Sequence, residues 1–199
     1  MQYLPAAVFI SGENMQRTHT KNLILCAMFV ALIAIGAFIT IPIPIIPLSM
    51  QDMFVLLAAV LLGPKWGCVS VCIYLLMGLA GIPIFTQGGG IGYVLRPTFG
   101  FLLGYIPASV LVGKLCYKED ENPGFKRILL SCLAGIAVIY FFGTVYLYLL
   151  NRLYLGNTIA LWPMILACDI QPLPGDIIKC ILTAWIGQRL IPLIRQGLI

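Results

Sequence analysis

The sequence predicts an all-α membrane protein, a bundle of about six transmembrane helices. Of its 199 residues, 61% are hydrophobic and only 10% are charged, and the mean hydropathy is +1.02. A water-soluble domain of this size could not bury so much apolar surface. Because a helix needs about 20 mainly apolar residues to cross the hydrocarbon core, the chain has room for about six crossings joined by short connections.

Proline, glycine and charged residues divide the apolar sequence into the expected helices. The first begins near Asn22 and ends before the proline-rich residues 41–47, which require an extended backbone. Gly63 and Pro64 separate two shorter helices. The six predicted helices cover residues 22–40, 49–62, 66–80, 97–116, 128–150 and 176–194. Residues 158–168 are apolar but too short to cross, so we expect a short or re-entrant helix there, with a seven-span arrangement as the alternative.

The polar N-terminal stretch lies outside these helices. We expect residues 1–21 to form a cytoplasmic extension and residues 22–199 to form one six-helix transmembrane domain. The stretch does not read as a signal peptide, because no basic segment precedes an apolar core with a cleavage site. Met15 opens a polar run directly before the first span, so residues 1–14 are interpreted as an upstream extension of the start site.

Lysine and arginine are distributed unevenly over the two sides of this topology. With the N-terminus in the cytoplasm, nine of them lie on the cytoplasmic side and two, Arg96 and Arg152, lie outside. Cytoplasmic loops retain such an excess of positive charge, so both termini are predicted to be cytoplasmic. The connections 41–48, 81–96 and 151–175 then all face outward.

Polar residues at membrane depth gather on that outer side, where they need either partners within the protein or a ligand. They are Gln51, Asp52, Gln87, Arg96, Asp176 and Lys179. A charge within the hydrocarbon costs about 2.5 kcal/mol or more unless it is paired or hydrated. Asp176 and Lys179 therefore indicate either a ligand site or a helix cap with its ion pair, and both interpretations stay open. Asp52 is interpreted as a residue at the water boundary.

The glycine-rich residues 88–92, GGGIG, also allow two interpretations. Glycine lets a backbone approach a ligand closely and lets a loop close as a lid, but such a run is equally typical of a flexible surface turn. The run does not indicate a phosphate-binding loop, because no Gly-Lys-Ser/Thr follows it.

The residue types of the chain disfavour several functional classes. Its seven cysteines show no CxxC spacing and lie mostly inside apolar runs, and its one histidine, His19, precedes the first span. We therefore expect no disulfide framework, no metal site, no cofactor and no catalytic residue. Basic residues are scattered rather than gathered on one face, which disfavours nucleic-acid binding. An intramembrane aspartyl protease would need a second aspartate at a helix centre.

Three segments carry a resemblance to a known family. They are SMQDMFVLLAAVLLGPKWG, GLAGIPIFTQGGGIGYVLRPTFGFLLGY and LPGDIIK. In sequence, order and spacing they resemble the signature segments of the BioY family, and the likeness extends from about Lys21 to the end of the chain. BioY proteins are the biotin-capturing S components of energy-coupling factor (ECF) transporters. The resemblance therefore implies high-affinity biotin binding and uptake by a six-helix bundle with one outward-opening site.

Carried over residue by residue, the resemblance implies a set of substrate-binding positions. They are Arg96, Asp176, Lys179, Gln51, Gly88, Gly89, Gly90 and Tyr93. Asp176 would accept hydrogen bonds from the ureido N–H groups of biotin, and Lys179 or Arg96 would hold its carbonyl or its carboxylate. The glycine run and Tyr93 would line or cover the pocket.

The first helix carries Ala27 and Ala31 at a small-xxx-small spacing, which allows two helices to pack closely in lipid. From the residues alone, this spacing favours ordinary packing within the bundle. In S components the corresponding alanines dock onto the transmembrane coupling (T) subunit, which acts with two ABC-type ATPase subunits. The resemblance implies these partners, since the chain has no Walker A motif of its own. The alternative is a stand-alone secondary carrier in the cell membrane for biotin or another small carboxylate solute.

Overall fold

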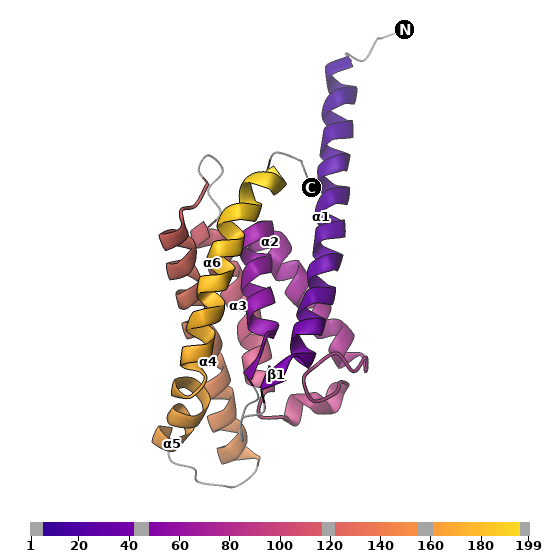
Figure 1. The fold of residues 1–199 in the computed structure, drawn as a ribbon. Helices are drawn as coiled ribbons and strands as arrows, with labels where there is room; N and C mark the ends of the chain where they lie inside the picture. The colour runs from indigo at the N-terminus through magenta and orange to yellow at the C-terminus, as the bar shows by residue number, and fades with distance from the viewer. Residues whose placement is uncertain (1–5, 42–47, 117–121, 155–160, 196–199) are drawn as a thin grey trace.

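The computed structural model describes residues 6–41, 48–116, 122–154 and 161–195, and every structural statement below refers to these ranges. Long helices lie side by side in a bundle (Figure 1). They are α1 (Ala6–Phe38), α2 (Gln51–Leu79), α3 (Phe99–Cys116), α4 (Phe125–Leu153) and α6 (Leu173–Arg195). The predicted all-α membrane fold is confirmed.

Short elements connect the helices at one end of the bundle. They are the strands β1 (Thr40–Ile41) and β2 (Leu48–Ser49), the 3₁₀ helix η1 (Ile91–Leu95), the helix α5 (Leu161–Ile165) and the π-helix η2 (Leu166–Ile170). The two strands pair antiparallel, with Thr40 opposite Ser49. Helix α1 begins and helix α6 ends toward the opposite end of the bundle, away from β1 and α5 (Figure 1).

Helix α2 is two helices joined by a sharp kink. Gly63 adopts φ 77° and ψ −176°, a conformation essentially restricted to glycine, and Pro64 follows it. A Cβ atom added to Gly67 would lie 2.8 Å from the Ala59 Cα, although eight residues of straight helix rise by about 12 Å. The chain therefore reverses at the kink (Figure 1), and the two halves correspond to the two short helices predicted from the sequence.

The number of helical segments follows from this reversal. Five described helices are long and apolar enough to cross a membrane, and the kink divides one of them. The described chain thus has the six segments that the sequence predicts. Helix α5 has only five residues, which is too short for the additional crossing of the seven-span alternative. It leads through η2 into α6, as expected for a short helical piece; residues 158–160 of the predicted piece lie outside the described ranges.

Helix α1 continues through the predicted boundary at residue 21. It begins at Ala6 and projects beyond the other helices (Figure 1), while its apolar part covers His19–Phe38. The division into an extension and a transmembrane domain stays a prediction, because the helix does not end there. Helix α1 packs mainly against α2, so one of its faces is left uncovered in the isolated chain.

The apolar core lies where α2, α3, α4 and α6 meet. Leu56, Val112 and Ile128 are among its fully buried side chains. The outer surface is also apolar, with large exposed side chains such as Leu130 and Ile178. A monomer in water rarely exposes so much apolar surface, whereas a lipid bilayer covers it without cost. The chain is accordingly a multi-pass membrane protein.

The close contact at Gly67 gives a first prediction. Gly67→Ala should destabilise the protein by about 1–3 kcal/mol, because the added methyl group meets the backbone of Ala59, which cannot rotate away. Gly92→Ala is the matched control, since a Cβ atom there meets no atom within 4 Å. Thermal unfolding in detergent measures both variants. Equal midpoints for the two would contradict the close packing of the two halves of α2.

Candidate ligand-binding pocket

A pocket opens between the helices at the end of the bundle that carries β2, η2 and the start of α6. The empty space inside it, open mouth included, is about 430 Å³. Its walls combine a charged cluster with aromatic and aliphatic side chains. The lining residues are Ser49, Asp52, Phe101, Tyr105, Ile136, Ile139, Tyr140, Cys168, Pro172, Asp176 and Lys179.

The first turns of α6 supply the charged centre of the pocket. The helix begins at Leu173, directly after the π-helix η2, and places Asp176 and Lys179 one turn apart on the same face. Lys179 Nζ donates to Asp176 Oδ1 at 2.6 Å, and both side chains are only 6% exposed. The two interpretations that the sequence left open thus coexist, because the ion pair is itself part of a pocket wall.

Lys179 is also bound by the junction of β2 and α2. Its Nζ donates to the Asp52 carboxylate oxygens at 3.0 and 3.1 Å and to the Ser49 carbonyl at 2.6 Å. The Asp52 residue is 7% exposed, so it does not lie at the water boundary as the sequence suggested. In the described part of the chain, both ion pairs involve Lys179. One buried cation therefore neutralises two carboxylates from different helices.

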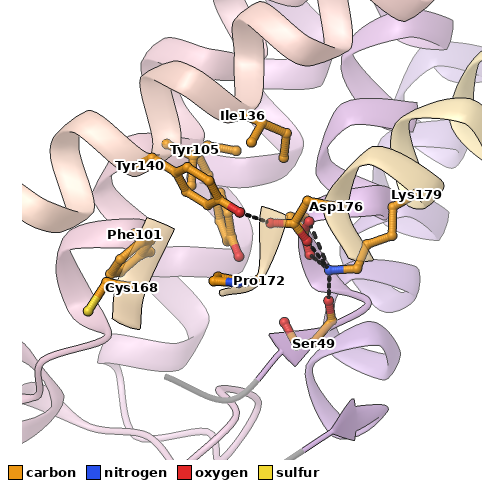
Figure 2. A pocket seen from close by; sticks show the side chains of 11 residues that line it. Ser49, Phe101, Tyr105, Ile136, Tyr140, Cys168, Pro172, Asp176 and Lys179 are labelled. Atoms are coloured by element: carbon orange, nitrogen blue, oxygen red, sulfur yellow. Dashed lines mark hydrogen bonds and ion pairs between the residues drawn. The ribbon is translucent and has the colours of Figure 1, made fainter. Parts of the chain in front are cut away.

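Two tyrosines complete the polar lining. Tyr140 of α4 donates its hydroxyl to Asp176 Oδ2, and Tyr105 of α3 points into the same space (Figure 2). One helical turn from Tyr140, Thr144 donates to the Asp169 carboxylate at 2.8 and 2.9 Å. Helix α4 thus donates hydrogen bonds to two carboxylates of the segment from η2 to α6. Asp176 belongs to the pocket lining, and Asp169 does not.

The arrangement suits a small ligand that is polar at one end. Carboxylate and carbonyl oxygens offer hydrogen-bond acceptors, the tyrosine hydroxyls both accept and donate, and the apolar side chains Phe101, Ile136 and Ile139 supply a wall for a hydrocarbon portion. No set of three or more His, Cys, Asp or Glu side chains among the described residues is arranged to hold a metal ion.

Gln51 lies next to Asp52 but outside the pocket lining. The residue is 2% exposed and its Nε2 has no hydrogen-bond partner among the described residues. Its backbone packs against α1, since a Cβ atom added to Gly36 would lie 3.1 Å from the Gln51 Cα. Leaving such a donor unsatisfied costs about 1–3 kcal/mol. The assignment of Gln51 to ligand binding stays a prediction.

The glycine loop folds back onto the end of α2 instead of lining the pocket. Gly88 and Gly90 have φ angles of 111° and 95°, which glycine adopts without strain. A Cβ atom on Gly89 would lie 2.3 Å from the Ile82 carbonyl oxygen, and the Gly90 N–H donates to the Gly78 carbonyl at 2.7 Å. The run is therefore an ordered turn in this structure, and its role as a cover over the ligand stays a prediction.

Tyr93 and Arg96 follow this loop and lie apart from the charged cluster. The Tyr93 ring packs against Phe85, and its hydroxyl shares a hydrogen bond of 3.1 Å with Thr98. Burial raises the pKa of Tyr93 above its ordinary value, and the Thr98 bond partly offsets that rise. Arg96 is exposed, and the structure gives its guanidinium no hydrogen bond or ion pair with the described residues. Neither side chain lines the pocket, so their binding roles stay predictions.

Ala27 and Ala31 lie on the face of α1 that points away from the bundle. Both are exposed, whereas Phe29 and Ile33 on the opposite face are buried against the neighbouring helices. Large apolar residues of the same outer face, such as Met28 and Ile35, are also exposed. The small residues therefore do not pack this bundle, and they form a shallow strip that another helix can approach.

Sequence reasoning missed several of the residues that form the pocket. The sequence does not single out Tyr105, Tyr140, Phe101 or Cys168, although all four line the pocket. Only Asp52 carried a signal, since a carboxylate in an apolar helix requires a partner. The tyrosines gave none, because aromatic residues are common throughout membrane helices.

Comparisons with known proteins agree with this architecture. A family model described as "BioY family" matches residues 12–196. The chain is 36% identical over 183 residues to the "Probable biotin transporter BioY" of Lysinibacillus sphaericus, covering 92% of this chain and 93% of that protein. It is 38% identical over 124 residues to the "Biotin transporter BioY" of Thermotoga maritima, covering 62% and 72%. The fold matches a crystal structure of the S-component for biotin from an ECF-type ABC transporter, with a TM-score of 0.74 and 30% identity over 87% of this chain and 92% of that chain.

The shared lysine gives a second prediction. Lys179→Met should destabilise the protein by about 3–5 kcal/mol, because it leaves two buried carboxylates without a cation. Adding Asp52→Asn and Asp176→Asn to it should restore much of the loss, since no buried charge then remains in the cluster. Thermal unfolding of the single and triple variants in detergent measures the difference. A triple variant no more stable than Lys179→Met would contradict this account of the cluster.

Proposed function

The chain belongs to the BioY family, and on that premise we propose that it binds biotin with high affinity and mediates its uptake as the S component of an ECF-type transporter. The observation that carries the proposal is the charged cluster Asp52–Lys179–Asp176 in the wall of an otherwise largely apolar pocket. The named relatives are transporters, so we assign the chain no catalytic residue.

The chemistry of biotin fits that pocket. Its ureido ring presents two N–H donors and one carbonyl acceptor, and the cluster presents carboxylate acceptors around one ammonium group. Charge-assisted hydrogen bonds of this kind are about twice as strong as those between neutral groups. The fused rings and the aliphatic tail can pack against Phe101, Ile136 and Ile139. The cluster therefore binds the polar ring, and the apolar walls exclude water from it.

The carboxylate of biotin needs a second cation. The described pocket lining contains no cation besides Lys179, and that lysine is already neutralised. Arg96 is exposed on the connection that follows the glycine run, with no ion pair among the described residues. We assign Arg96 to the ligand carboxylate, with Gly88–Gly90 and Tyr93 forming the cover that brings it over the pocket. Closure of such a loop removes the bound ligand from water.

The uneven distribution of basic residues supports an outward-facing pocket. The helix ends at the far end of the bundle carry Lys65 at the kink of α2, Lys114 in the last turn of α3 and Arg127 in the first turn of α4. That end is cytoplasmic by the positive-inside rule. The termini then lie in the cytoplasm, and the pocket opens on the other side, where the vitamin arrives.

The outer face of α1 is proposed to dock onto a transmembrane coupling subunit that works with two ABC-type ATPases. The exposure of Ala27 and Ala31 supports this assignment, because small side chains allow the backbones of two helices to approach closely in lipid. The face lies on a helix that supplies no residue to the pocket lining. Binding of biotin and coupling to ATP hydrolysis therefore use separate surfaces of the chain.

Equilibrium binding tests the proposed substrate. The purified chain should bind biotin with a dissociation constant below about 1 µM, and Asp176→Asn should weaken binding by about tenfold or more, since a charge-assisted hydrogen bond is worth about 1.5–3 kcal/mol. Asp169→Asn removes the same charge outside the pocket lining and should bind like the parent. Failure of the parent chain to bind micromolar biotin would refute the function. Equal binding by Asp176→Asn would return that residue to a purely structural role.

Substitution of the two alanines tests the proposed partner. Replacing Ala27 and Ala31 by Leu should leave biotin binding by the purified chain unchanged but abolish copurification with a coupling subunit and its ATPases, because bulky side chains prevent close approach. The matched control places Leu at Met28 on the same exposed face. Loss of biotin binding would show that the alanines stabilise the bundle itself. Intact assembly with full uptake would exclude them from docking, and uptake by the solitary parent chain in liposomes would favour a stand-alone carrier.

A further inference from the structure

The amine of Lys179 has no hydrogen-bond donor left for a ligand in this structure. A lysine ammonium carries three N–H donors and no acceptor. Its Nζ already donates to the Ser49 carbonyl, to the Asp52 carboxylate and to Asp176 Oδ1. These three groups use all of its donors. An oxygen atom of a ligand can therefore bind Lys179 only by replacing one of them.

Asp52 is the partner that is most easily replaced. Its bonds to Lys179 measure 3.0 and 3.1 Å, whereas the bonds to Ser49 and Asp176 each measure 2.6 Å. Asp176 is held one turn before Lys179 on the same helix, and its second oxygen accepts from Tyr140. The Ser49 carbonyl belongs to the backbone of β2, which is paired with β1, so it cannot turn away by a side-chain rotation. Asp52 alone can leave Lys179 by rotating its side chain.

From this arrangement we propose that Asp52 is the resident counter-ion of Lys179 and that the bound ligand takes its place. The inference rests on the proposed function, in which the ligand is biotin. An acceptor oxygen of the ligand receives the N–H donor that Asp52 held, and the Asp52 carboxylate turns toward the pocket space that it already lines. Asp52 thus competes with the ligand for the amine, and it lowers the affinity of every ligand that must use Lys179.

The exchange also changes the connection between two parts of the fold. Ser49 and Asp52 belong to the junction of β2 and α2, while Lys179 belongs to α6, 127 residues farther along the chain than Asp52. Figure 2 shows the lysine reaching from its helix toward Ser49, with Asp176 beside it. When the ligand replaces Asp52, the Ser49 carbonyl is the remaining partner of Lys179 from that junction. Ligand binding therefore weakens the tie between α2 and α6.

Asp52→Asn tests the proposal, because it keeps the shape and one acceptor oxygen but removes the charge that competes with the ligand. Isothermal titration calorimetry of the purified variant should show biotin bound about threefold more tightly than by the parent, or tighter still. Asp169→Asn is the matched control, since it removes a carboxylate held by Thr144 instead of Lys179, and its affinity should equal that of the parent. Asp52→Thr is the second variant if the first does not stay monodisperse.

The gain in affinity caused by Asp52→Asn should also require the amine of Lys179. When Asp52→Asn is added to Lys179→Met, it should produce no further gain, because there is no amine left to compete for. Unchanged or weaker binding by the folded Asp52 variants would overturn the proposal. So would an equal gain in Asp169→Asn, or a gain that persists without Lys179. If the parent itself does not bind biotin, the proposed function fails instead, so the two failures are distinguishable.

Discussion

A buried lysine shared by two carboxylates organises the pocket end of this membrane protein. Lys179 joins Asp176 on its own helix to Asp52 and Ser49 at the start of another, and Tyr140 fixes the second oxygen of Asp176 from a third. Charges taken out of water require such partners, because an unpaired buried charge costs several kcal/mol. Three helices therefore have to meet at one point, and the pocket is the space that their convergence leaves open.

The rest of the bundle makes this convergence possible. The reversal at Gly63 brings the first half of α2 back beside its second half, so that the Asp52 end of the helix lies at the same end of the molecule as the start of α6. The π-helical turn of η2 directly precedes α6 and contributes Cys168 to the pocket wall. Such turns often occur at functional sites because they change the direction of side chains within an otherwise regular helix.

The pocket and the exposed face of α1 lie on different helices, which suits a subunit that captures a solute while other subunits hydrolyse ATP. The pocket lies among α2, α3, α4 and α6, while α1 contributes mainly its contact with α2 and leaves Ala27 and Ala31 exposed. Helix α2 carries both Asp52 and the surface against which α1 packs. A single helix thus connects the proposed ligand site with the proposed docking face.

The sequence by itself determined the properties that depend on local composition. Hydropathy located the helices, the Gly63–Pro64 pair marked the reversal, and the spacing of Asp176 and Lys179 placed them on one face of a helix. Only the tertiary structure decided which side chains meet. The distance between Asp52 and Lys179 depends on how two helices cross, and nothing along 127 residues of chain records that angle. The same holds for Tyr140, whose aromatic ring is indistinguishable in sequence from those that face lipid, because a membrane helix is apolar on every side and so gives no periodic signal of its buried face.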